Sequence, residues 1–410
     1  MTEAPLAGVT VLDLSRVLSG PYCTMLAADM GARVIKIEHP VRGDDTRAWG
    51  PPFQQGESAY YLSVNRNKQS VALDFKSPGG RRVLDALIAR ADVLVENFRP
   101  GTLDALGLGF ATLHAVHPRL LYVSISGFGQ TGPRREEAGY DMVAQAEGGI
   151  MSITGSPGGP GFRMGVAIAD VAAGMFAFQG LLLALFARVR TGQGQLVDVS
   201  LLDSVLALLT YQAGRYFATG EPPTRTGNRH TAIAPYDSFD AADGELILAV
   251  GNDGQWQRFC RALALDQLAA DPRFPTNDQR VVRYDELRPL IAAAIERQPL
   301  DRVVATLRAA GVPCGAVRSI AEALGDPQAA ARAMVETIDH RSIGAIRMLG
   351  LPVKLSATPG RVVSAPPRLG EHTFTVLRED VGLTAREIDA LERQGIVRSI
   401  RPDEDARSGA

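Results

Sequence analysis

The chain contains little cysteine. Only three of its 410 residues are cysteines, and Cys23, Cys260 and Cys314 are widely spaced, odd in number and free of Cys-x-x-Cys pairing. This pattern excludes a disulfide-stapled scaffold and offers no zinc-ligand spacing. We therefore expect a protein of the reducing cytoplasm that holds no metal ion.

The chain also lacks an excess of charge of either sign. Its 43 basic and 45 acidic side chains leave a formal net charge of −2. Such a balance creates no general field for nucleic acid or for an anionic membrane, so any phosphate site must be built locally. We expect neither as a partner.

Long apolar runs are missing as well. The longest, residues 171–187, is rich in Ala and Gly and is shorter than the roughly 20 residues that span a bilayer. We expect it to form a buried helix. The opening sequence, MTEAPLAG, has no basic segment ahead of an apolar run, so we expect no signal peptide.

The remaining composition is that of a globular protein, with 46% hydrophobic and 21% charged residues. A chain of 410 residues is too long for one ordinary core, which predicts two domains or one split domain. The polar segment 221–228 and the Pro- and Gly-containing stretch 338–367 are candidate linkers. Between them, ELILAVG predicts a short strand pair followed by helices, and residues 371–397 predict a helical tail.

The first third of the chain alternates strand-like and helix-like segments. The expected helices follow Gly20-Pro21 and cover residues 80–91, and the expected strands cover residues 9–15, 33–38, 70–75, 92–97 and 120–127. This rhythm predicts an α/β fold with a doubly wound, Rossmann-like parallel sheet. Ligands of such sheets bind beyond the carboxyl ends of the strands.

The same opening segment raises the alternative of a dinucleotide site. Glu38 follows the second strand about where a ribose-binding acid would stand. The turn, however, carries only Gly20 before Pro21 instead of G-x-G-x-x-G, so the backbone has no means of approaching a pyrophosphate closely. We therefore do not expect an NAD site.

Asp170 is the candidate that stands out further along the chain. It is the only ionisable side chain between Arg163 and Arg188, at the head of an apolar helix expected from 170 to about 188. One interpretation is an N-cap, and another is a nucleophile. The two are compatible, because the N-terminus of a helix stabilises a carboxylate as the anion. A second helix is expected from 199 to 219.

The segment GNDGQW, residues 251–256, follows the strand of ELILAVG. It is interpreted either as a plain turn or as a flexible lid whose backbone N–H groups face a developing oxyanion. Lys76, Arg99, Arg47 and Arg134 follow strands or lie in loops, where a phosphate could bind. Scattered basic residues are common on surfaces, so the sequence alone does not group them.

Several long motifs supply a resemblance. They include RVLSGPYCTMLAADMGARVIKIE, NRNKQSVALDFKS, ADVLVENFRPG, SGFGQTGP, GYDMVAQAEGG, SITGSPGGP, VAIADVAAG and RTGQGQLVDVSLLDS. In this order, from about Leu6 to Thr373, they resemble the class III CoA-transferase (CaiB/BaiF) family, which contains formyl-CoA and carnitine CoA-transferases and the α-methylacyl-CoA racemases. The resemblance implies an interlocked homodimer of chains with a large Rossmann-like domain built from both chain ends. It places the domains at 1–220 with a linker helix, 221–330 as a small α+β domain, and 331–410 as the return linker and the rest of the large domain.

The resemblance also implies the site residues. Asp170 matches the nucleophile, and Gly251, Gly254 and Gln255 match the glycine lid that excludes water. The residues that match CoA-binding positions are Leu18, Ser19, Leu73, Lys76, Asn97, Phe98, Arg99 and Tyr140. Ala105 and His39 stand where basic residues are frequent in the family, so the CoA phosphates are expected to use other bases.

The implied activity is CoA transfer between two carboxylic acids through an aspartyl-CoA thioester, with acyl-CoA as substrate and no permanently bound cofactor. The alternatives are a racemase, which would carry His at Tyr140 and EPQF in place of DGQW, and a non-catalytic CoA-binding protein. Tyrosine is a poor base at neutral pH, which favours the transferase. The segment GNDGQ together with TGNRHTAIAPY resembles members that use succinyl-CoA or another short dicarboxyl-CoA. Arg47, Arg229 or His230 could hold the distal carboxylate, and surface or structural roles are the alternative for all three.

Overall fold

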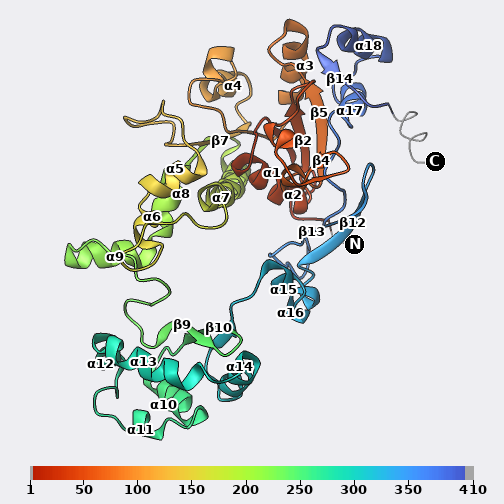
Figure 1. Ribbon diagram of the computed structural model, residues 1–410. Helices are drawn as coiled ribbons and strands as arrows, with labels where there is room; N and C mark the ends of the chain where they lie inside the picture. Colours follow the sequence, from red (N-terminus) through yellow and green to blue (C-terminus); the bar gives the residue numbers. More distant parts are fainter. Residues whose placement is uncertain (1–2, 402–410) are drawn as a thin grey trace. The chain divides into compact units, whose positions relative to one another are not determined.

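The computed structural model describes residues 3–401, which form two compact units (Figure 1). Within these residues, unit 1 contains residues up to 150, then 163–214 and those from 328 onward, whereas unit 2 contains 151–162 and 215–327. Unit 1 thus joins both ends of the chain. Unit 2 differs from the small domain expected at 221–330 chiefly by including residues 151–162.

A seven-stranded sheet organises unit 1. Its order is β14-β5-β2-β1-β6-β7-β8, and all neighbours are parallel except β14 with β5. The strands are β1 (Thr10–Asp13), β2 (Arg33–Glu38), β5 (Lys68–Leu73), β6 (Val93–Glu96), β7 (Leu121–Ser126), β8 (Leu196–Ser200) and β14 (Val397–Arg398). The chain runs outward from β1 through β2 to β5, then returns to β6. A topological switch point therefore lies between β1 and β6, and the predicted mixed α/β fold is confirmed.

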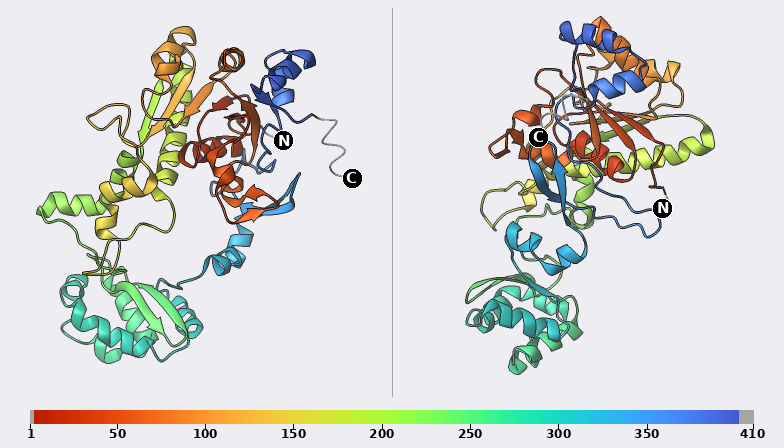
Figure 2. Two further views of the ribbon diagram at one scale, coloured as in Figure 1. Left: turned by 45° about the horizontal axis from the view of Figure 1, so that its top comes forward. Right: turned by 90° about the vertical axis from the view of Figure 1, so that its right-hand side faces the viewer.

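The sheet is covered on both faces, as a parallel sheet requires (Figure 2). Successive strand residues point to opposite faces, so Val11 enters one core and Leu12 the other. The first core contains residues of α1 (Ser19–Asp29), α5 (Asp141–Glu147), α7 (Ile168–Thr191) and α8 (Leu201–Leu208). The second contains residues of α3 (Pro78–Ile88), α4 (Phe110–Val116), α17 (Thr373–Glu379) and α18 (Ala385–Arg393).

Strand β8 corrects the sequence interpretation, which had placed the start of a helix at 199. Val197 and Val199 pack against the first core, and Ser200 ends the strand and caps α8 by accepting the Asp203 N–H at 2.9 Å. Pairing with β7 decides the strand, because five alternating residues before a helix carry little local signal. The expected end at 219 agrees with α9 (Thr210–Thr219).

A hairpin occupies part of the stretch expected to be a return linker. Strands β12 (Val335–His340) and β13 (Gly344–Leu349) pair along their full length, and Gly344 has the positive φ of 79° that the turn requires. The helical tail expected at 371–397 is present as α17 and α18, after which β14 joins the sheet edge. Residues 402–410 lie outside the described part of the chain.

Unit 2 has its own core. The antiparallel sheet β11-β10-β9 packs against helices around Trp256, Phe259, Phe274 and Leu287. These elements are β9 (Tyr236–Ala241), β10 (Gly244–Ala249), β11 (Cys314–Ala316), α10 (Asp253–Ala262), α11 (Asp266–Ala269), α12 (Asn277–Val282), α13 (Tyr284–Ile295) and α14 (Leu300–Ala309). The expected strand pair is thus a three-stranded sheet. The remaining short elements are η1 (Asp45–Ala48), β3 (Phe53–Gln54), β4 (Glu57–Ser58), α2 (Ala59–Val64), η2 (Asp104–Leu106), α6 (Ile150–Ile153), α15 (Ile320–Leu324) and α16 (Pro327–Ala331).

Helix α7 is longer than the sequence analysis expected. It has 24 residues, and its most apolar 18-residue window has a mean hydropathy of 1.8, so by length and composition it could cross a membrane, a property shared by core helices of soluble proteins. One face, carrying Ala173, Ala177 and Leu181, is buried in the first core. The opposite face is exposed, with Leu183 at 70% and Phe186 at 64% of full exposure. The prediction of a buried helix is therefore correct for one face only.

Candidate active site

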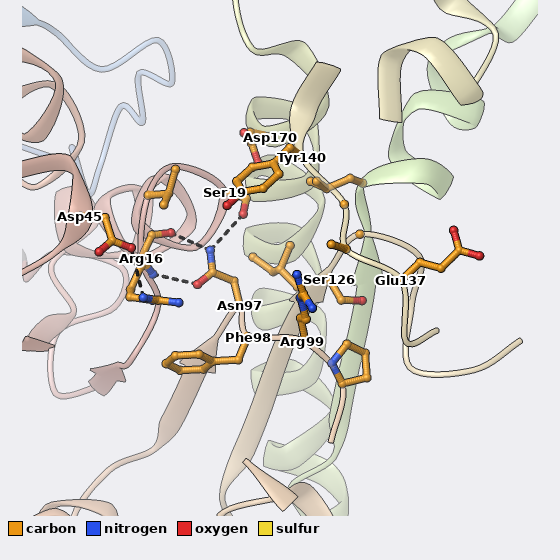
Figure 3. Close-up of a pocket in the computed structure, with 17 residues that line it drawn as sticks. Arg16, Ser19, Asp45, Asn97, Phe98, Arg99, Ser126, Glu137, Tyr140 and Asp170 are labelled. Atoms are coloured by element: carbon orange, nitrogen blue, oxygen red, sulfur yellow. Dashed lines mark hydrogen bonds and ion pairs between the residues drawn. The ribbon is translucent and has the colours of Figure 1, made fainter. Parts of the chain in front are cut away.

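Asn97 joins the two loops that leave the switch point. Its side-chain Oδ1 accepts the Arg16 N–H at 2.8 Å, and its Nδ2 donates to the Arg16 carbonyl at 2.6 Å (Figure 3). Asn97 follows β6, and Arg16 follows β1, so the bonds fix one loop against the other. The amide expected to contact CoA is therefore occupied mainly in shaping the site.

The loop after β1 is held in a constrained conformation. Val17 has a φ of 69°, which is unusual for a β-branched residue and marks a strained position. Its N–H donates to Asp44 Oδ1 at 3.3 Å. Position 20 requires glycine, because a Cβ there would lie 2.2 Å from the Ser15 side chain. Helix α1 can thus begin directly at the switch point.

Two buried ion pairs stabilise this loop. Lys36 Nζ lies 2.9 Å from Asp44 Oδ2 and donates to the Ser15 carbonyl at 2.8 Å. Lys68 Nζ lies 3.2 Å from Asp13 Oδ2. All four charged side chains are fully buried, so breaking either pair would leave an uncompensated charge. We infer that the network keeps the loop in one arrangement.

Asp170 does not cap its helix, contrary to the first interpretation. Helix α7 begins at Ile168, so Asp170 is its third residue, and the N-cap Ala167 has no side-chain bond. The cap comes from another helix, because Asp141 Oδ1 accepts the Ala169 N–H at 2.9 Å. The carboxylate of Asp141 also accepts from Gln145 Nε2 at 2.8 Å. Asp170 is consequently free of a capping role.

The charge of Asp170 is also less stabilised than the sequence suggested. Burial raises its pKa from the ordinary value of 3.8 to about 7, with a further contribution from the nearby Asp141 charge. A side-chain hydrogen bond with Ser19 lowers the pKa and partly offsets both effects. Desolvation and the Asp141 charge thus outweigh the Ser19 hydrogen bond and act against the ionised form that the start of the helix was expected to favour.

A cavity of about 180 Å³ lies in front of Asp170 (Figure 3). It brings together six residues predicted from the sequence, namely Ser19, Asn97, Phe98, Arg99, Tyr140 and Asp170. Among the described residues that line it, the cations are Arg16 and Arg99. Arg16 is paired with Asp45 at 3.1 Å.

A second cavity, of about 320 Å³, adjoins the first. Arg16 and Phe98 line both. The predicted residues Leu73 and Lys76 line the second cavity, together with His39 and Arg42. The shared loop residues thus border both the cavity that contains Asp170 and the cavity that contains these basic side chains.

Sequence reasoning did not include Arg16 and Arg42 among the site residues, and the role of Leu18 stays a prediction. Both arginines follow the carboxyl end of a central strand, which was an available signal. Arg42 is a candidate for the phosphate contact that His39 was expected to weaken. Leu18, 8% exposed, packs with Met25 and Val64 and is not among the residues lining either cavity.

The bases suggested for a distal carboxylate are engaged elsewhere. Arg47 donates to Glu38 at 2.7 and 2.8 Å and to the Tyr61 hydroxyl at 2.6 Å, with only 10% of its side chain exposed. Arg229, in unit 2, pairs with Asp285 at 3.0 Å, and the ring of His230 packs against Tyr236. These contacts contradict the suggestion for Arg47. The same pairing occupies Glu38, consistent with the absence of a dinucleotide fingerprint.

The segment 251–256 is the start of a helix and not an open turn. Asn252 caps α10 by accepting the Gln255 N–H at 2.9 Å, and neither Gly251 nor Gly254 has a positive φ. Gln255 Oε1 accepts the Gly251 N–H at 2.6 Å, so this N–H is already bonded. The three predicted lid residues belong to unit 2, whereas Asp170 belongs to unit 1. Their role in excluding water stays a prediction.

Arg134 completes the predicted bases. It pairs with Glu137 at 2.7 Å and with Glu147, which leaves it engaged within its own loop region.

Within residues 3–401, no group of three or more His, Cys, Asp or Glu side chains is placed to hold a metal ion.

Comparison with known proteins decides the family. The model of CoA-transferase family III matches residues 6–373. The chain belongs to this family. A succinate–glutarate CoA-transferase of Agrobacterium fabrum is 42% identical over 383 residues, which cover 92% of this chain and 96% of the relative. An acetyl-CoA:oxalate CoA-transferase of Acetobacter aceti is 42% identical over 355 residues, covering 86% of this chain and 90% of the relative.

The fold agrees with a member of known structure. The crystal structure of a CAIB/BAIF family protein from Brucella suis matches with a TM-score of 0.83 and 40% identity, covering 92% of this chain and all of the other. As a member of family III, the present chain is a CoA-transferase, so the predicted family and enzyme class are confirmed.

Proposed function

We propose that this CoA-transferase moves CoA from a donor acyl-CoA to an acceptor acid through a thioester on Asp170. The observation that carries the proposal is the position of Asp170. It is a carboxylate without a capping role that lines the cavity at the switch point, and a second cavity with Lys76 and Arg42 adjoins it. A nucleophile and a phosphate site are thereby connected.

The chemistry conserves charge at every step. An oxygen of Asp170 attacks the donor carbonyl, the C–S bond breaks, and CoA leaves as a thiolate from a mixed anhydride. The thiolate attacks the aspartyl carbon and releases the donor acid, leaving Asp170 as a CoA thioester. The acceptor carboxylate then repeats both steps in reverse. One thioester is exchanged for another, so the reaction needs no ATP.

Replacing Asp170 tests the route. We expect Asp170→Ala and Asp170→Asn to lose about a thousandfold or more of activity. Hydroxylamine added during turnover should convert Asp170 to a hydroxamate that peptide mass spectrometry locates. Near-normal exchange of labelled acid into acyl-CoA by Asp170→Asn would overturn the proposal. Exchange of an α-proton with deuterated solvent would indicate a racemase.

The predicted lid residues are part of the proposal as a device that limits hydrolysis. Water would destroy the anhydride and the thioester, so a protected site is needed. Gly254→Ala and Gln255→Ala should raise the ratio of acyl-CoA hydrolysis to CoA transfer. A ratio identical to that of the wild type in both variants would remove these residues from the mechanism.

The acceptor is proposed to be a short dicarboxylic acid. The relatives in the comparison are named for succinate, glutarate and oxalate. Once one carboxylate reacts at Asp170, the other needs a cation, and Arg99 lines the same cavity. Among the described residues, Arg16 is paired with Asp45, whereas no ion pair or side-chain hydrogen bond involves the guanidinium of Arg99.

Acceptor selectivity checks this assignment. Arg99→Leu should raise KM for glutarate or succinate about tenfold while leaving KM for a monocarboxylic acid of similar length within about twofold. Arg42→Leu is the matched control, because its position beside Lys76 predicts a higher KM for every acyl-CoA. An equal loss for both acids would assign Arg99 to CoA instead.

We also propose a cytoplasmic homodimer. Met175, Leu182, Phe186 and Val189 lie on one exposed face of α7, because their spacing keeps them within one stripe of the helix. A second copy of the chain would bury this stripe. Light scattering should give twice the chain mass of 43.8 kDa. Phe186→Glu should favour the monomer, and a monomeric wild type would refute the dimer. Localisation of a tagged chain tests the compartment.

A further inference from the structure

Glu96 is a buried carboxylate that the mechanism above does not use. It ends β6 immediately before Asn97 and is 5% exposed. Its Oε2 accepts the Phe98 N–H at 2.8 Å, and its Oε1 contacts the Ser124 hydroxyl on the neighbouring strand β7. The carboxylate thus holds the backbone of a turn whose residues line the Asp170 cavity.

The contacts continue to the opposite rim of that cavity. Gln130 Nε2 donates to Ser124 Oγ at 2.8 Å, and the Gln130 N–H donates to Asp198. Gln130 belongs to the loop between Gly127 and Gly139, whose backbones approach so closely that a Cβ on Gly127 would lie 2.6 Å from the Gly139 Cα. The end of this loop, with Tyr140 directly after it, supplies the rim residues 137–140.

The direction of the hydrogen bonds favours an ionised Glu96. Gln130 Nε2 can only donate, so Ser124 Oγ accepts from it and has its own hydrogen for Glu96 Oε1. The Phe98 N–H also donates to the carboxylate. Every group has a partner in this arrangement. A protonated Glu96 would bring a second donor to Ser124 and leave the serine hydrogen without its partner.

We propose that Glu96 is a positioning residue for the acyl-CoA donor. Through Ser124 and Gln130 it holds the turn of residues 97–99 against the loop of residues 127–139, and so fixes the two walls between which the donor binds. The inference rests on the proposed function. It predicts a change in donor affinity, whereas the reacting carboxylate at Asp170 stays in place.

The surroundings of Glu96 make its charge sensitive to pH. The pKa of Glu96 is raised to about 7, chiefly by burial and also by the charges of Asp104 and Asp198, while the hydrogen bonds from Ser124 and the Phe98 N–H lower it. Tyr122 faces it from β7, and Arg99 lines the same cavity of about 230 Å³. Donor binding by the wild type should therefore weaken as pH falls below this value.

Binding of free coenzyme A, measured by titration calorimetry, tests the proposal without requiring turnover. Glu96→Gln and Ser124→Ala should each weaken CoA binding about threefold to tenfold and raise KM for succinyl-CoA similarly, with kcat within about twofold. Gln130→Ala, at a more accessible position, should act in the same direction. The pH dependence of CoA affinity should be flatter in Glu96→Gln.

Asp104→Asn is the matched control, because Asp104 lines the same cavity on an exposed 3₁₀ helix and has no part in these hydrogen bonds. Measured at about pH 8.5, where Glu96 is ionised with or without the Asp104 charge, its CoA affinity should equal that of the wild type. Unchanged CoA affinity in Ser124→Ala and Gln130→Ala, or a fall in kcat at constant KM, would overturn the proposal. A wild type that binds CoA but transfers none would instead refute the proposed function.

Discussion

In the proposed mechanism Asp170 attacks the thioester as an anion, because a protonated carboxyl group is not a nucleophile. The pKa of Asp170 should then set the working pH of the enzyme. Burial and the Asp141 charge place that pKa at about 7. We expect kcat for CoA transfer to rise with pH through this value and to level off above it, because the anion is the nucleophile. A profile measured between about pH 5.5 and 9 in single-turnover experiments checks this. A flat profile would contradict it.

The same residue should lower the stability of the folded protein at high pH. Between the ordinary value of 3.8 and about 7, the folded state binds the Asp170 proton and the unfolded state has lost it. The contribution of Asp170 to folding therefore falls as pH rises through this window and stays low above it.

Asp170→Asn removes that loss because its amide has no charge to desolvate. We expect the variant to be more stable than the wild type at pH 8 by about 1–3 kcal/mol, a figure reduced for partial solvent access. Near pH 4 the difference should nearly vanish. Urea unfolding at both pH values measures the effect, and an equal difference at both would be evidence against the raised pKa.

The start of α7 depends on a side chain from α5, and two substitutions of Asp141 separate its two effects. Asp141→Asn keeps an oxygen for the Ala169 N–H but removes the negative charge, so the rise of kcat with pH should move to lower pH. Asp141→Ala also removes the cap and should cost about 1 kcal/mol of stability.

Single-turnover profiles and urea midpoints of the two variants distinguish these effects. If both variants kept the wild-type pH profile, Asp141 would have no influence on the charge of Asp170. If Asp141→Ala were as stable as Asp141→Asn, the hydrogen bond to Ala169 would contribute nothing as a cap.

At the scale of the whole molecule, Arg47 connects the two ends of the chain within unit 1. It pairs with Glu38 and donates to the Pro367 carbonyl at 3.0 Å, 320 residues further on. Arg47→Ala should lower the free energy of unfolding by about 3–5 kcal/mol, because Glu38 would be left buried without its counter-ion. KM for the acceptor acid should not change.

Arg273→Ala is the control for this prediction. Arg273 pairs with Asp271 at 2.8 Å, but nearly half of its side chain is exposed, so the loss should be below about 1 kcal/mol. Equal effects of the two substitutions on the urea midpoint would argue against a structural role for the buried pair.

The sequence by itself determined most of the individual strands and helices. Apolar segments with turn residues at their ends located most strands of the large sheet, and 33–38 coincides with β2. Asp170 was singled out as the lone acid at the head of an apolar helix, and the motifs assigned the chain to a family. These features are local, because periodicity and turn chemistry act over a few residues. Where the local signal was short, as at β8 and the 335–349 hairpin, pairing with a distant strand decided the structure.

Only the tertiary structure decided how the site is assembled. The return of the chain from β5 to β6 places Asn97 beside Arg16, although 81 residues separate them. Helix α5 supplies the cap that Asp170 was expected to provide. Burial raises the pKa of Asp170, whereas its helix position alone suggested an anion. Desolvation and long-range pairing depend on which distant segments come together, and no short stretch of sequence contains that information.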